Sequence, residues 1–310
     1  MLAAMESATA MPSVVVPRER KVFTYAAGHP PAAVVAQGER FVVETTSAFG
    51  EFPLQPGDTL EGLERERCDP LTGPIAVDGA AAGDVLEVAI ESIEVQGSGA
   101  QGILPGGGIL DWPRLPLMFH DVADGEVLFP GGLRLALAPM IGCLGVAPAG
   151  APVASVLPGD HGGNMDTRHV CPGSTVELPV HHDGALLFLG DCHQLQGDGE
   201  LCGVAPETDA VVTLRCAVRP GPAIRRPRIR TAERLYFVAS AETLEAAGKL
   251  ATGDLVDALV DERGLDPDIA YFLVTVKADL EVCQVVNELR TARVGIDLSL
   301  WEQLGAATGP

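Results

Sequence analysis

The chain has 310 residues, of which 47% are hydrophobic and 20% charged, with 42 acidic and 21 basic side chains and a formal net charge of -21. These proportions exclude a disordered chain and a coiled coil rich in Glu and Lys, and they predict a compact fold. The acidic excess repels phosphate backbones and therefore argues against nucleic acid as a partner.

No apolar run approaches the ~20 residues that span a bilayer, so no membrane partner is expected. The first twenty residues lack the blocks of a secretion signal, because Glu6 interrupts the apolar part and no basic residue precedes Arg18. The seven cysteines are an odd number without Cys-x-x-Cys spacing, which indicates reduced thiols. Together these features predict a cytoplasmic location.

Residues 14–219 are predicted to form a β-rich body that carries the catalytic residues. Short apolar runs, such as those at 40–44, 84–91 and 133–137, alternate with turns drawn from the 36 glycines and 24 prolines of the chain. In the second run, apolar and acidic residues alternate with the two-residue period of a half-buried strand. This pattern is typical of a β-sandwich or a β-barrel.

Residues 220–310 are predicted to be a smaller α+β part that packs on the body, so that the whole chain forms one integrated domain. The segment 220–230 holds three prolines and four arginines, which forbids a regular helix and favours a connector or an edge strand. Ser240 and Asp254 are each expected to cap a helix. The expected fold class is therefore mainly β, and α+β overall.

The unusual chemistry is concentrated between residues 158 and 207. The segment 158–166 is predicted to be a tight loop, since its adjacent glycines let the backbone bend while polar side chains converge. Residues 185–189 are predicted to be a buried strand, and Asp191 and His193 continue from its end. If the chain stays extended there, these two side chains share one face and suit a zinc-like cation.

Asp198 and Glu200 lie in the glycine-rich segment that follows, and the same spacing places them side by side. Two neighbouring carboxylates repel each other, which raises their affinity for a proton or a cation and suits a general base. Each element alone is compatible with ordinary turn chemistry, because Gly-Asp pairs favour turns and a single histidine is usually a satisfied polar residue. Their concentration within forty positions predicts a functional site.

Three nearby features have simpler interpretations. His181 and His182 are adjacent, so their side chains diverge and a solvated turn is favoured over a metal site. Cys192 alternates with its polar neighbours and is expected to be a small core residue instead of a nucleophile. The glycines at 106–108 are predicted to be a flexible loop, since no Lys-Ser/Thr follows them as in a phosphate cradle.

Several strings resemble the acetamidase/formamidase family, in order and at the family's spacing, from about residue 25 to residue 290. They are TGPI at 72–75, GDVL at 83–86, PGGGILD at 105–111, PMIGCLGVAP at 139–148, PGDHGGNMD at 158–166, LPV at 178–180, GAL at 184–186, GDCH at 190–193 and QGDGE at 196–200, with AY at 270–271 and QVV at 284–286 near the end.

The resemblance implies a β-rich cytoplasmic hydrolase that cleaves short-chain amides to a carboxylate and ammonia. It also implies a zinc-like divalent metal and assembly into a homo-oligomer. The positions that match the family's site are His161, Asn164, Asp166, Asp191, His193, Asp198, Glu200 and, as an additional site residue, Asp111.

An amide carbonyl is a poor electrophile, and a metal ion both polarises it and makes water a nucleophile near neutral pH. We expect three or four metal ligands to come from His161, Asp166, Asp191 and His193, with one coordination position left for water. Zn²⁺ is favoured, because two histidines are softer ligands than Ca²⁺ prefers. Ca²⁺ is the alternative. Glu200 is the expected base that moves a proton from water to the leaving nitrogen. Asp198 would orient Glu200 or hold the amide NH₂, and Asn164 would donate to the oxyanion.

Three alternatives stay open. A covalent amidase would pair a Cys or Ser nucleophile with a lysine, but the three lysines, at 21, 249 and 277, are distant in sequence from the polar segment. A non-catalytic binding protein would use the same residues to hold Ca²⁺ or a small amide. A hydrolase of the same family would act on a lactam or on another amide.

Overall fold

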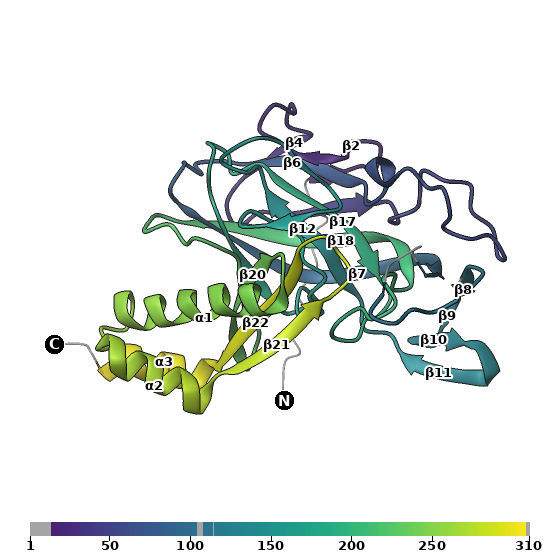
Figure 1. Ribbon diagram of the computed structural model, residues 1–310. Helices are drawn as coiled ribbons and strands as arrows, with labels where there is room; N and C mark the ends of the chain where they lie inside the picture. Colours follow the sequence, from purple (N-terminus) through teal and green to yellow (C-terminus); the bar gives the residue numbers. More distant parts are fainter. Residues whose placement is uncertain (1–13, 104–107, 114, 308–310) are drawn as a thin grey trace, which may run out of the picture.

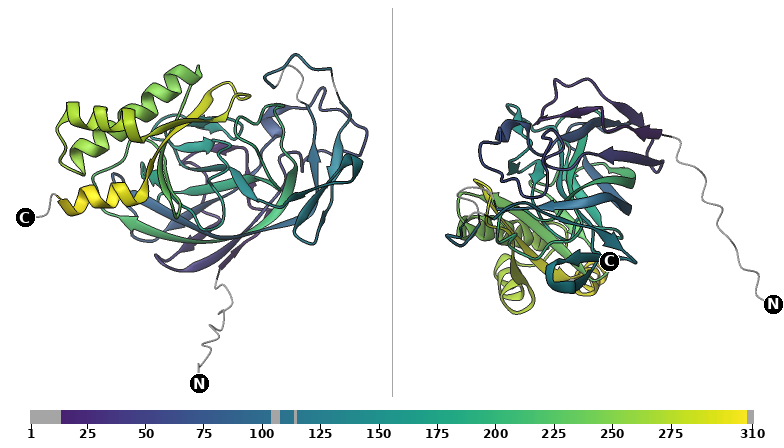
Figure 2. Two further views of the ribbon diagram at one scale, coloured as in Figure 1. Left: turned by 90° about the horizontal axis from the view of Figure 1, so that it is seen from below. Right: turned by 90° about the vertical axis from the view of Figure 1, so that its right-hand side faces the viewer.

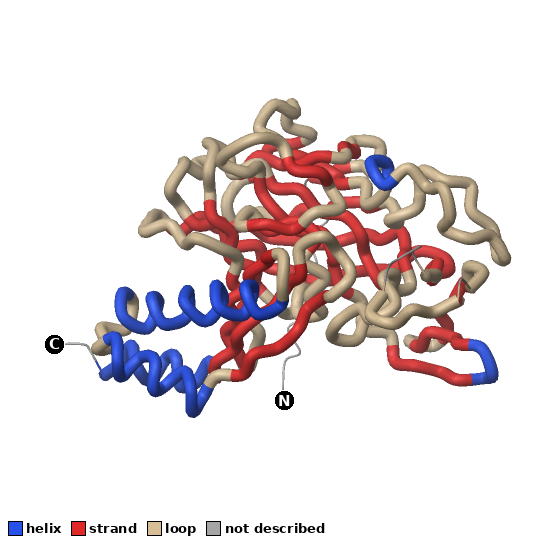
Figure 3. Tube along the Cα trace, in the orientation of Figure 1, coloured by secondary structure: helices blue, strands red, loops and turns tan. Residues whose placement is uncertain are grey.

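The computed structural model describes residues 14–103, 108–113 and 115–307. Strands form most of the molecule (Figure 3), and the three helices gather at one end of it (Figure 1). The prediction of a mainly β fold with a small helical C-terminal part is confirmed. Two sequence predictions concern residues outside the described ranges. They are the expected lack of a secretion signal, which concerns residues 1–13, and the flexible glycine loop, of which residues 106–107 are not described.

One hydrogen-bonded sheet of 17 strands curls around the main core. Its strands are β1 (Val14–Val16), β2 (Lys21–Val22), β4 (Ala33–Val35), β5 (Arg40–Thr45), β6 (Leu71–Val77), β7 (Val85–Gln101), β8 (Met118–His120), β12 (Met140–Val146), β14 (Pro158–Gly159), β15 (Gly162–Asn164), β16 (Thr175–Pro179), β17 (Leu187–His193), β18 (Glu207–Arg219), β19 (Arg228–Arg230), β20 (Arg234–Ala241), β21 (Asp279–Gln284) and β22 (Arg290–Asp297). Its pairings are antiparallel, except that β1 with β5 and β4 with β6 are parallel.

Alternating side chains build the core of this sheet. In β7, Leu86, Val88 and Ile90 are at most 2% exposed while Glu87 and Glu91 are half-buried, as the two-residue period predicted. The long strands β7 and β18 pair over most of their lengths. This pairing gives the body a rigid frame on which the shorter strands are arranged.

Two smaller sheets complete the β structure. The first contains β9 (Val122–Ala123), β10 (Glu126–Phe129) and β11 (Leu133–Ala136), and the second contains β3 (Thr24–Tyr25) and β13 (Val153–Ala154). The first sheet lies on the side of the molecule away from the helices (Figure 2). Single 3-10 turns occupy Arg65–Arg67 and Pro130–Gly132.

The helices α1 (Leu244–Asp261), α2 (Pro267–Lys277) and α3 (Leu298–Ala307) cover β20 and β22. A separate core forms between them, in which Leu255, Leu259 and Trp301 pack with Phe237 of β20. Trp301 and Phe237 meet edge to face, with their ring centroids 6.1 Å apart. The C-terminal part therefore has its own apolar layer, although its strands belong to the large sheet.

The expectation of two helices capped by Ser240 and Asp254 is wrong. A single 18-residue helix, α1, forms in place of the two, and its N-cap is Thr243, whose side chain accepts a hydrogen bond from the Ala246 backbone. Ser240 lies in β20, and Asp254 lies inside α1, where it accepts hydrogen bonds from Arg226 at 2.9 Å. Arg226 therefore pairs with the Asp254 carboxylate in the middle of α1, and Asp254 is not an N-cap.

The segment 220–230 is a connector as far as residue 227, but its end is an interior strand instead of an edge strand. β19 pairs with β16 on one side and with β20 on the other. The last proline of the segment 220–230 is Pro227, which precedes β19, so the three residues of β19 keep all their backbone N–H donors. Through β19, the strands of the two parts of the chain join into one sheet.

The seven cysteines are all free thiols, as the sequence predicted. Cys192 is fully buried in the main core, which confirms its interpretation as a small core residue. Among the described residues, no helix is long and apolar enough to cross a membrane.

Candidate active site

Strand β12 brings the predicted site residues together from both sides. On one side it pairs with β17, placing Met140 opposite His193 and Cys143 opposite Gly190. On the other side it pairs with β15, placing Cys143 opposite Asn164. Asp166 follows β15, and its backbone N–H donates to the Gly142 carbonyl of β12. The loop 158–166 and the strand end 190–193 therefore meet over β12.

Two more strands extend this arrangement. β17 pairs with β18, so that His193 lies opposite Glu207, the first residue of β18. β17 also pairs with β6, so that Gly190 lies opposite Leu71 and brings the preceding Asp69 to the site. A carboxylate cluster results, in which five buried acids surround His193: Asp69, Asp166, Asp191, Glu200 and Glu207.

Four members of the carboxylate cluster have left-handed backbones. The φ angles are +51° at Asp69, +44° at Asp166, +56° at Asp191 and +46° at Glu200, and only seven non-glycine residues of the described chain have positive φ. Such conformations are unfavourable for side chains other than glycine and concentrate at functional sites. The extended conformation assumed for residue 191 is therefore wrong, yet Asp191 and His193 still meet while Cys192 points into the core.

The ligand atoms of the cluster are close enough to share a cation. Those of Asp166, Asp191 and His193 lie within 4.8 Å of one another, and so do those of His193, Glu200 and Glu207. His193 Nε2 is 3.2 Å from Asp191 Oδ1 and 3.1 Å from Glu207 Oε2. A third group of the same size joins Asp191 to Asp69 and Cys143.

Gln196 fixes the orientation of the His193 ring. Its Oε1 is 2.8 Å from His193 Nδ1, and its Nε2 donates to the Asp166 carbonyl at 2.8 Å. Because Gln196 Oε1 accepts only, Nδ1 carries the proton and Nε2 faces the acids. Metal-binding histidines are typically held in this way by a hydrogen bond at the other ring nitrogen.

Gly142 makes room for two of the carboxylates. A Cβ at this position would lie 2.3 Å from Asp191 Oδ2 and 2.6 Å from Asp166 Oδ1. These distances are far below van der Waals contact, so any other residue would displace the acids. The sequence motif around residue 142 therefore includes a glycine for a spatial reason.

Burial dominates the electrostatics of the carboxylate cluster. Burial, followed by the neighbouring Asp191 carboxylate, raises the pKa of Asp166 to about 7. Burial also raises the pKa of Glu200 and of Glu207 well above the ordinary range. For His193, burial opposes protonation, but Glu207 and Asp191 outweigh it and raise the pKa of the ring. Since one imidazole cannot neutralise five acids, the cluster must hold protons or a cation.

A cavity of about 40 Å³ lies among these side chains. Its walls include Asp69, Asp166, Asp191, Glu200 and Glu207 together with Arg65 and Asn287. A buried water occupies roughly 10–15 Å³ in this measure, so the cavity suits a few atoms or an ion. Among the described residues, Asp166 Oδ1 is buried without a hydrogen-bond partner. The donor set and this unpaired oxygen both fit a divalent cation.

The structure brings Asp166, Asp191, His193 and Glu200 together, but it places His161 apart. His161 lies in the turn between β14 and β15, and the three groups of possible ligands do not include it. Its ring meets Tyr25 edge to face at 4.7 Å, and burial lowers its pKa to about 4. Its Nε2 is buried and has no partner within the described part of the chain. Its role as a ligand stays a prediction.

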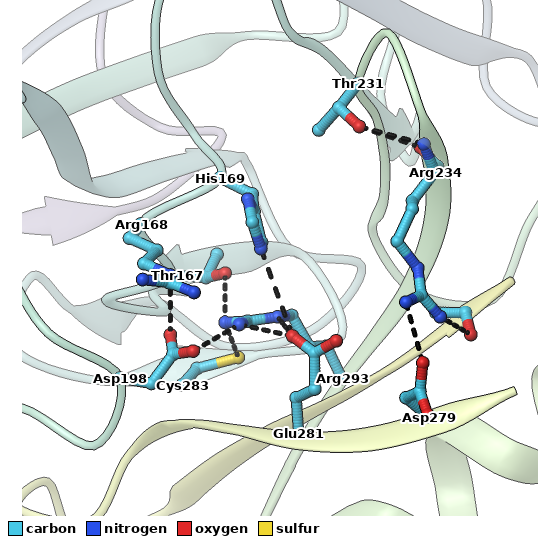
Figure 4. Close-up of polar contacts among 11 residues, drawn as sticks. Thr167, Arg168, His169, Asp198, Thr231, Arg234, Asp279, Glu281, Cys283 and Arg293 are labelled. Atoms are coloured by element: carbon cyan, nitrogen blue, oxygen red, sulfur yellow. Dashed lines mark hydrogen bonds and ion pairs between the residues drawn. The ribbon is translucent and has the colours of Figure 1, made fainter. Parts of the chain in front are cut away.

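Asp198 and Asp111 also lie away from the carboxylate cluster. Asp198 accepts from the fully buried Arg293 at 2.7 Å and pairs with Arg168 at 3.3 Å (Figure 4). It does, however, line a second cavity of about 340 Å³ together with Glu200. Asp111 is exposed on the loop 108–113. The catalytic roles expected of both residues stay predictions.

Asn164 lies beside the cavity with an unexpected orientation. Its Nδ2 donates to Asp69 Oδ2 at 3.1 Å. Its Oδ1 is buried and has no hydrogen-bond partner among the residues described. The free group of Asn164 is therefore an acceptor, whereas a donor to the oxyanion was predicted at this position.

Five residues of the site are absent from the predicted set: Asp69, Glu207, Gln196, Asn287 and Gly142. Four of them lie in or near motifs that the sequence shows, so the sequence could have indicated them. Asp69 precedes the TGPI motif by three positions, Gln196 opens the QGDGE motif, and Gly142 lies inside the PMIGCLGVAP motif. Asn287 directly follows the QVV string at 284–286, whereas Glu207 reaches the site through strand pairing and no local pattern marks it.

The other sequence interpretations can also be located. His182 Nε2 is 2.8 Å from the Pro148 carbonyl and lies in a turn, as expected. Cys68 lines the cavity, but burial and Asp69 raise its thiol pKa to about 12, which disfavours a nucleophilic thiolate. The described lining of the cavity contains neither lysine nor serine. The residues that line this cavity therefore do not support the nucleophile–lysine pair of a covalent amidase.

A curled β-sheet with a small cavity lined by buried carboxylates characterises this protein, and comparisons with known proteins identify its family. The acetamidase/formamidase family model matches residues 24–156 and 145–243. The chain belongs to the acetamidase/formamidase family, as its motifs predicted.

Solved structures and a curated relative agree with this assignment. An acetamidase from Bacillus halodurans is 36% identical with a TM-score of 0.91, covering 94% of this chain and 99% of that one. A predicted acetamidase/formamidase from Thermoanaerobacter tengcongensis is 35% identical with a TM-score of 0.90, covering 94% and 98%. The acetamidase of Mycolicibacterium smegmatis is 27% identical over 245 residues, 56% of this chain and 60% of that protein. The chain spans about three fifths of the length of the curated relatives it matches.

Proposed function

We propose that this protein hydrolyses the carbon–nitrogen bond of a small linear amide, such as formamide or acetamide, to a carboxylate and ammonia, and that the reaction depends on a divalent cation. Membership of the acetamidase/formamidase family supports the reaction class. The observation that carries the proposal is the excess of five buried acids over one imidazole around a cavity of about 40 Å³. A site of this size suits a small substrate.

The residues proposed to hold the cation are Asp166, Asp191 and His193, whose ligand atoms lie within 4.8 Å of one another. His193 is fixed by Gln196 with Nε2 toward the acids. An imidazole with carboxylates favours Zn²⁺ over Ca²⁺, which prefers oxygen ligands alone. His161 lies outside this group and is left out of the proposed set. A bound divalent cation supplies Lewis acidity, which polarises the amide carbonyl and activates water.

Glu200 is the proposed general base. Its carboxyl is buried beside Asp166 and His193, and burial raises its pKa well above the usual range, which strengthens it as a proton acceptor once it is ionised. It takes a proton from the attacking water and returns it to the leaving nitrogen, since ammonia must leave protonated. Asn164 Oδ1, which has no partner within the described chain, accepts a hydrogen bond from the amide NH₂. This proposal replaces the oxyanion role expected of Asn164.

Ammonia release from formamide and acetamide tests the proposal directly. Treatment with a chelator should abolish the release, and added Zn²⁺ should restore it. Release that survives complete removal of metal would refute the metal dependence. Tight metal binding without turnover of any amide would favour the alternative of a non-catalytic binding protein.

Metal content of two variants tests the proposed ligands. Asp166→Asn should retain less than a tenth of the wild-type metal, because the amide oxygen carries no charge. Asp160→Asn is a matched control in the neighbouring hairpin, since the Asp160 carboxylate is 61% exposed and pairs with Arg226. Equal metal content in both variants would contradict the ligand assignment. Assembly into a homo-oligomer and a cytoplasmic location stay predictions of the family resemblance.

A further inference from the structure

The turn between β21 and β22 touches the segment that carries Glu200. The Gly199 N–H donates to the Cys283 carbonyl at 2.9 Å, and the Val285 N–H donates to the Gly199 carbonyl at 3.1 Å. Gly199 directly precedes Glu200. The end of β21 and the start of this turn therefore fix the backbone from which the proposed base extends. The turn begins within the QVV string at 284–286, although the family model itself matches residues only as far as 243.

Gln284 organises the turn from inside. Its side chain is fully buried, and its Oε1 accepts from the backbone N–H groups of Val286 and Asn287 at 2.9 and 3.0 Å. Its Nε2 donates to the Leu289 carbonyl at 2.6 Å and to Thr291 Oγ1 at 2.9 Å. A carboxamide has two acceptor and two donor positions, and all four are used here. Gln284 therefore holds one conformation of the turn.

This conformation presents Asn287 to the carboxylate cluster. The Asn287 side chain lines the cavity and is only 6% exposed. Its Nδ2 donates to Asp166 Oδ2 at 3.0 Å and approaches the Asn164 carbonyl at 3.4 Å. The other carboxylate oxygen, Asp166 Oδ1, has no partner among the described residues. Asn287 thus binds one oxygen of Asp166 and leaves the other one free.

We propose that Asn287 is a positioning residue of the active site, which orients Asp166 so that Oδ1 faces the cation, and that Gln284 holds the turn that presents Asn287. This inference rests on the proposed cation site. Hydrogen bonds to ligating carboxylates fix their orientation, and their loss typically weakens metal binding by about 10–100-fold. Asn287, which lies 121 positions from Asp166 in the sequence, therefore connects the C-terminal part of the chain to the active site.

The test compares Asn287→Ala and Asn287→Asp with wild type in the metal-stripped protein. The dissociation constant for Zn²⁺ is measured by competition with a chromophoric chelator, and kcat and KM for formamide are measured after reloading. Asn287→Ala should weaken Zn²⁺ binding by about 10–100-fold. Asn287→Asp keeps the shape but replaces the donor with a second carboxylate, so its loss should be at least as large. In both variants kcat should fall while KM for formamide changes little.

Glu288→Ala is the matched control, because Glu288 is the exposed neighbour in the same turn and should leave both constants unchanged. A wild-type Zn²⁺ constant in Asn287→Asp would overturn the inference, since packing alone would then explain the residue. If Asn287→Ala fails to fold, Asn287→Ser, which retains a small donor, must bind Zn²⁺ more tightly than Asn287→Asp. A wild-type protein that neither binds Zn²⁺ nor releases ammonia would instead refute the proposed function.

Discussion

Two clusters of charged residues lie in the same molecule, and they differ in how their charges are paired. The carboxylate cluster has five acids around one imidazole. The arginine cluster surrounds the fully buried Arg293, which pairs with Asp198 at 2.7 Å and with Glu281, while Arg168 pairs with Asp198 (Figure 4). In the arginine cluster opposite charges are matched, whereas in the carboxylate cluster they are not.

This difference indicates that the arginine cluster stabilises the fold, whereas the carboxylate cluster serves function. Burying an ion is costly unless it is paired, and the arginine cluster meets this requirement with its own side chains. The carboxylate cluster does not, and it also contains four left-handed residues. An arrangement that costs stability twice is expected to serve function. Substitutions in the carboxylate cluster should therefore change turnover, and substitutions in the arginine cluster should change stability.

The largest effect is expected for Glu200→Gln. Loss of a general base typically reduces the rate by about 10²–10⁴-fold, and we expect kcat for formamide to fall about 10³-fold. Metal content should stay at the wild-type level, because Glu200 is not in the proposed ligand set. Asp198→Asn is the comparison in the arginine cluster, and its kcat should change less than about tenfold. Undiminished turnover in Glu200→Gln would exclude Glu200 as the base.

Gly142→Ala should have the next largest effect. Its new Cβ would lie 2.3 Å from Asp191 Oδ2, so the carboxylates must move apart. Displacements of about 1 Å at a reaction centre cost about 10²-fold in rate, and we expect this loss in kcat/KM. Gly197→Ala is the control on the Glu200 segment, because its Cβ would meet nothing within 4 Å. Equal activities of the two variants would show that the close approach at Gly142 is unimportant.

Arg293→Met should act on stability instead of turnover. It leaves Asp198 and Glu281 without their buried partner, and these side chains are 31% and 25% exposed. Removing one partner of a fully buried pair costs about 3–5 kcal/mol, and partial hydration reduces the expected loss here to about 2 kcal/mol. Urea unfolding of the metal-free protein measures it. Arg225→Met removes an exposed pair with Asp257 and should cost less than about 1 kcal/mol. Similar losses in both variants would contradict the distinction.

The sequence predicts the parts of the fold that depend on local patterns. The two-residue period in residues 84–91 identified β7, because alternate side chains must face the core. Glycine and aspartate at 253–254 suggested a helix boundary, but packing of Leu255 and Leu259 on β20 and β22 carries α1 through it. Likewise, the double pairing of β19 depends on strands far away in the sequence, which no local pattern reveals.

The same contrast between local patterns and long-range packing applies to the residues of the site. Asp166, Asp191, His193 and Glu200 were predicted together because they lie in one polar segment of the sequence. The structure adds Asp69, Glu207 and Asn287, which arrive through the register of β6, β18 and a distant turn. Asp198 shares the local pattern of Glu200, but Arg293, 95 positions away, pairs with it. Spacing predicts which side chains are near one another, and only the fold determines their partners.

The smallest effect is expected at His169, in the arginine cluster. The ring stacks on Tyr236 at 4.4 Å, and its facing charges are Arg293, Arg168, Arg234, Asp198 and Glu281. Burial, followed by the two nearest arginines, lowers the pKa of His169 to about 4 from an ordinary 6.5. The folded protein therefore holds fewer protons than the unfolded chain between these values, so His169 costs stability as the pH falls from 6.5 to 4.

His169→Phe keeps a ring against Tyr236 and removes the titrating group. Because the side chain of His169 is 21% exposed, we expect its acid-dependent loss to be only on the order of 1 kcal/mol. Urea unfolding at pH 6.5 and at pH 4.5 should show wild type losing about this much more stability than the variant. The carboxylate cluster is unchanged in both proteins, so its own titration cancels in the difference. An identical pH dependence of the two proteins would show that the arginine cluster does not keep His169 neutral.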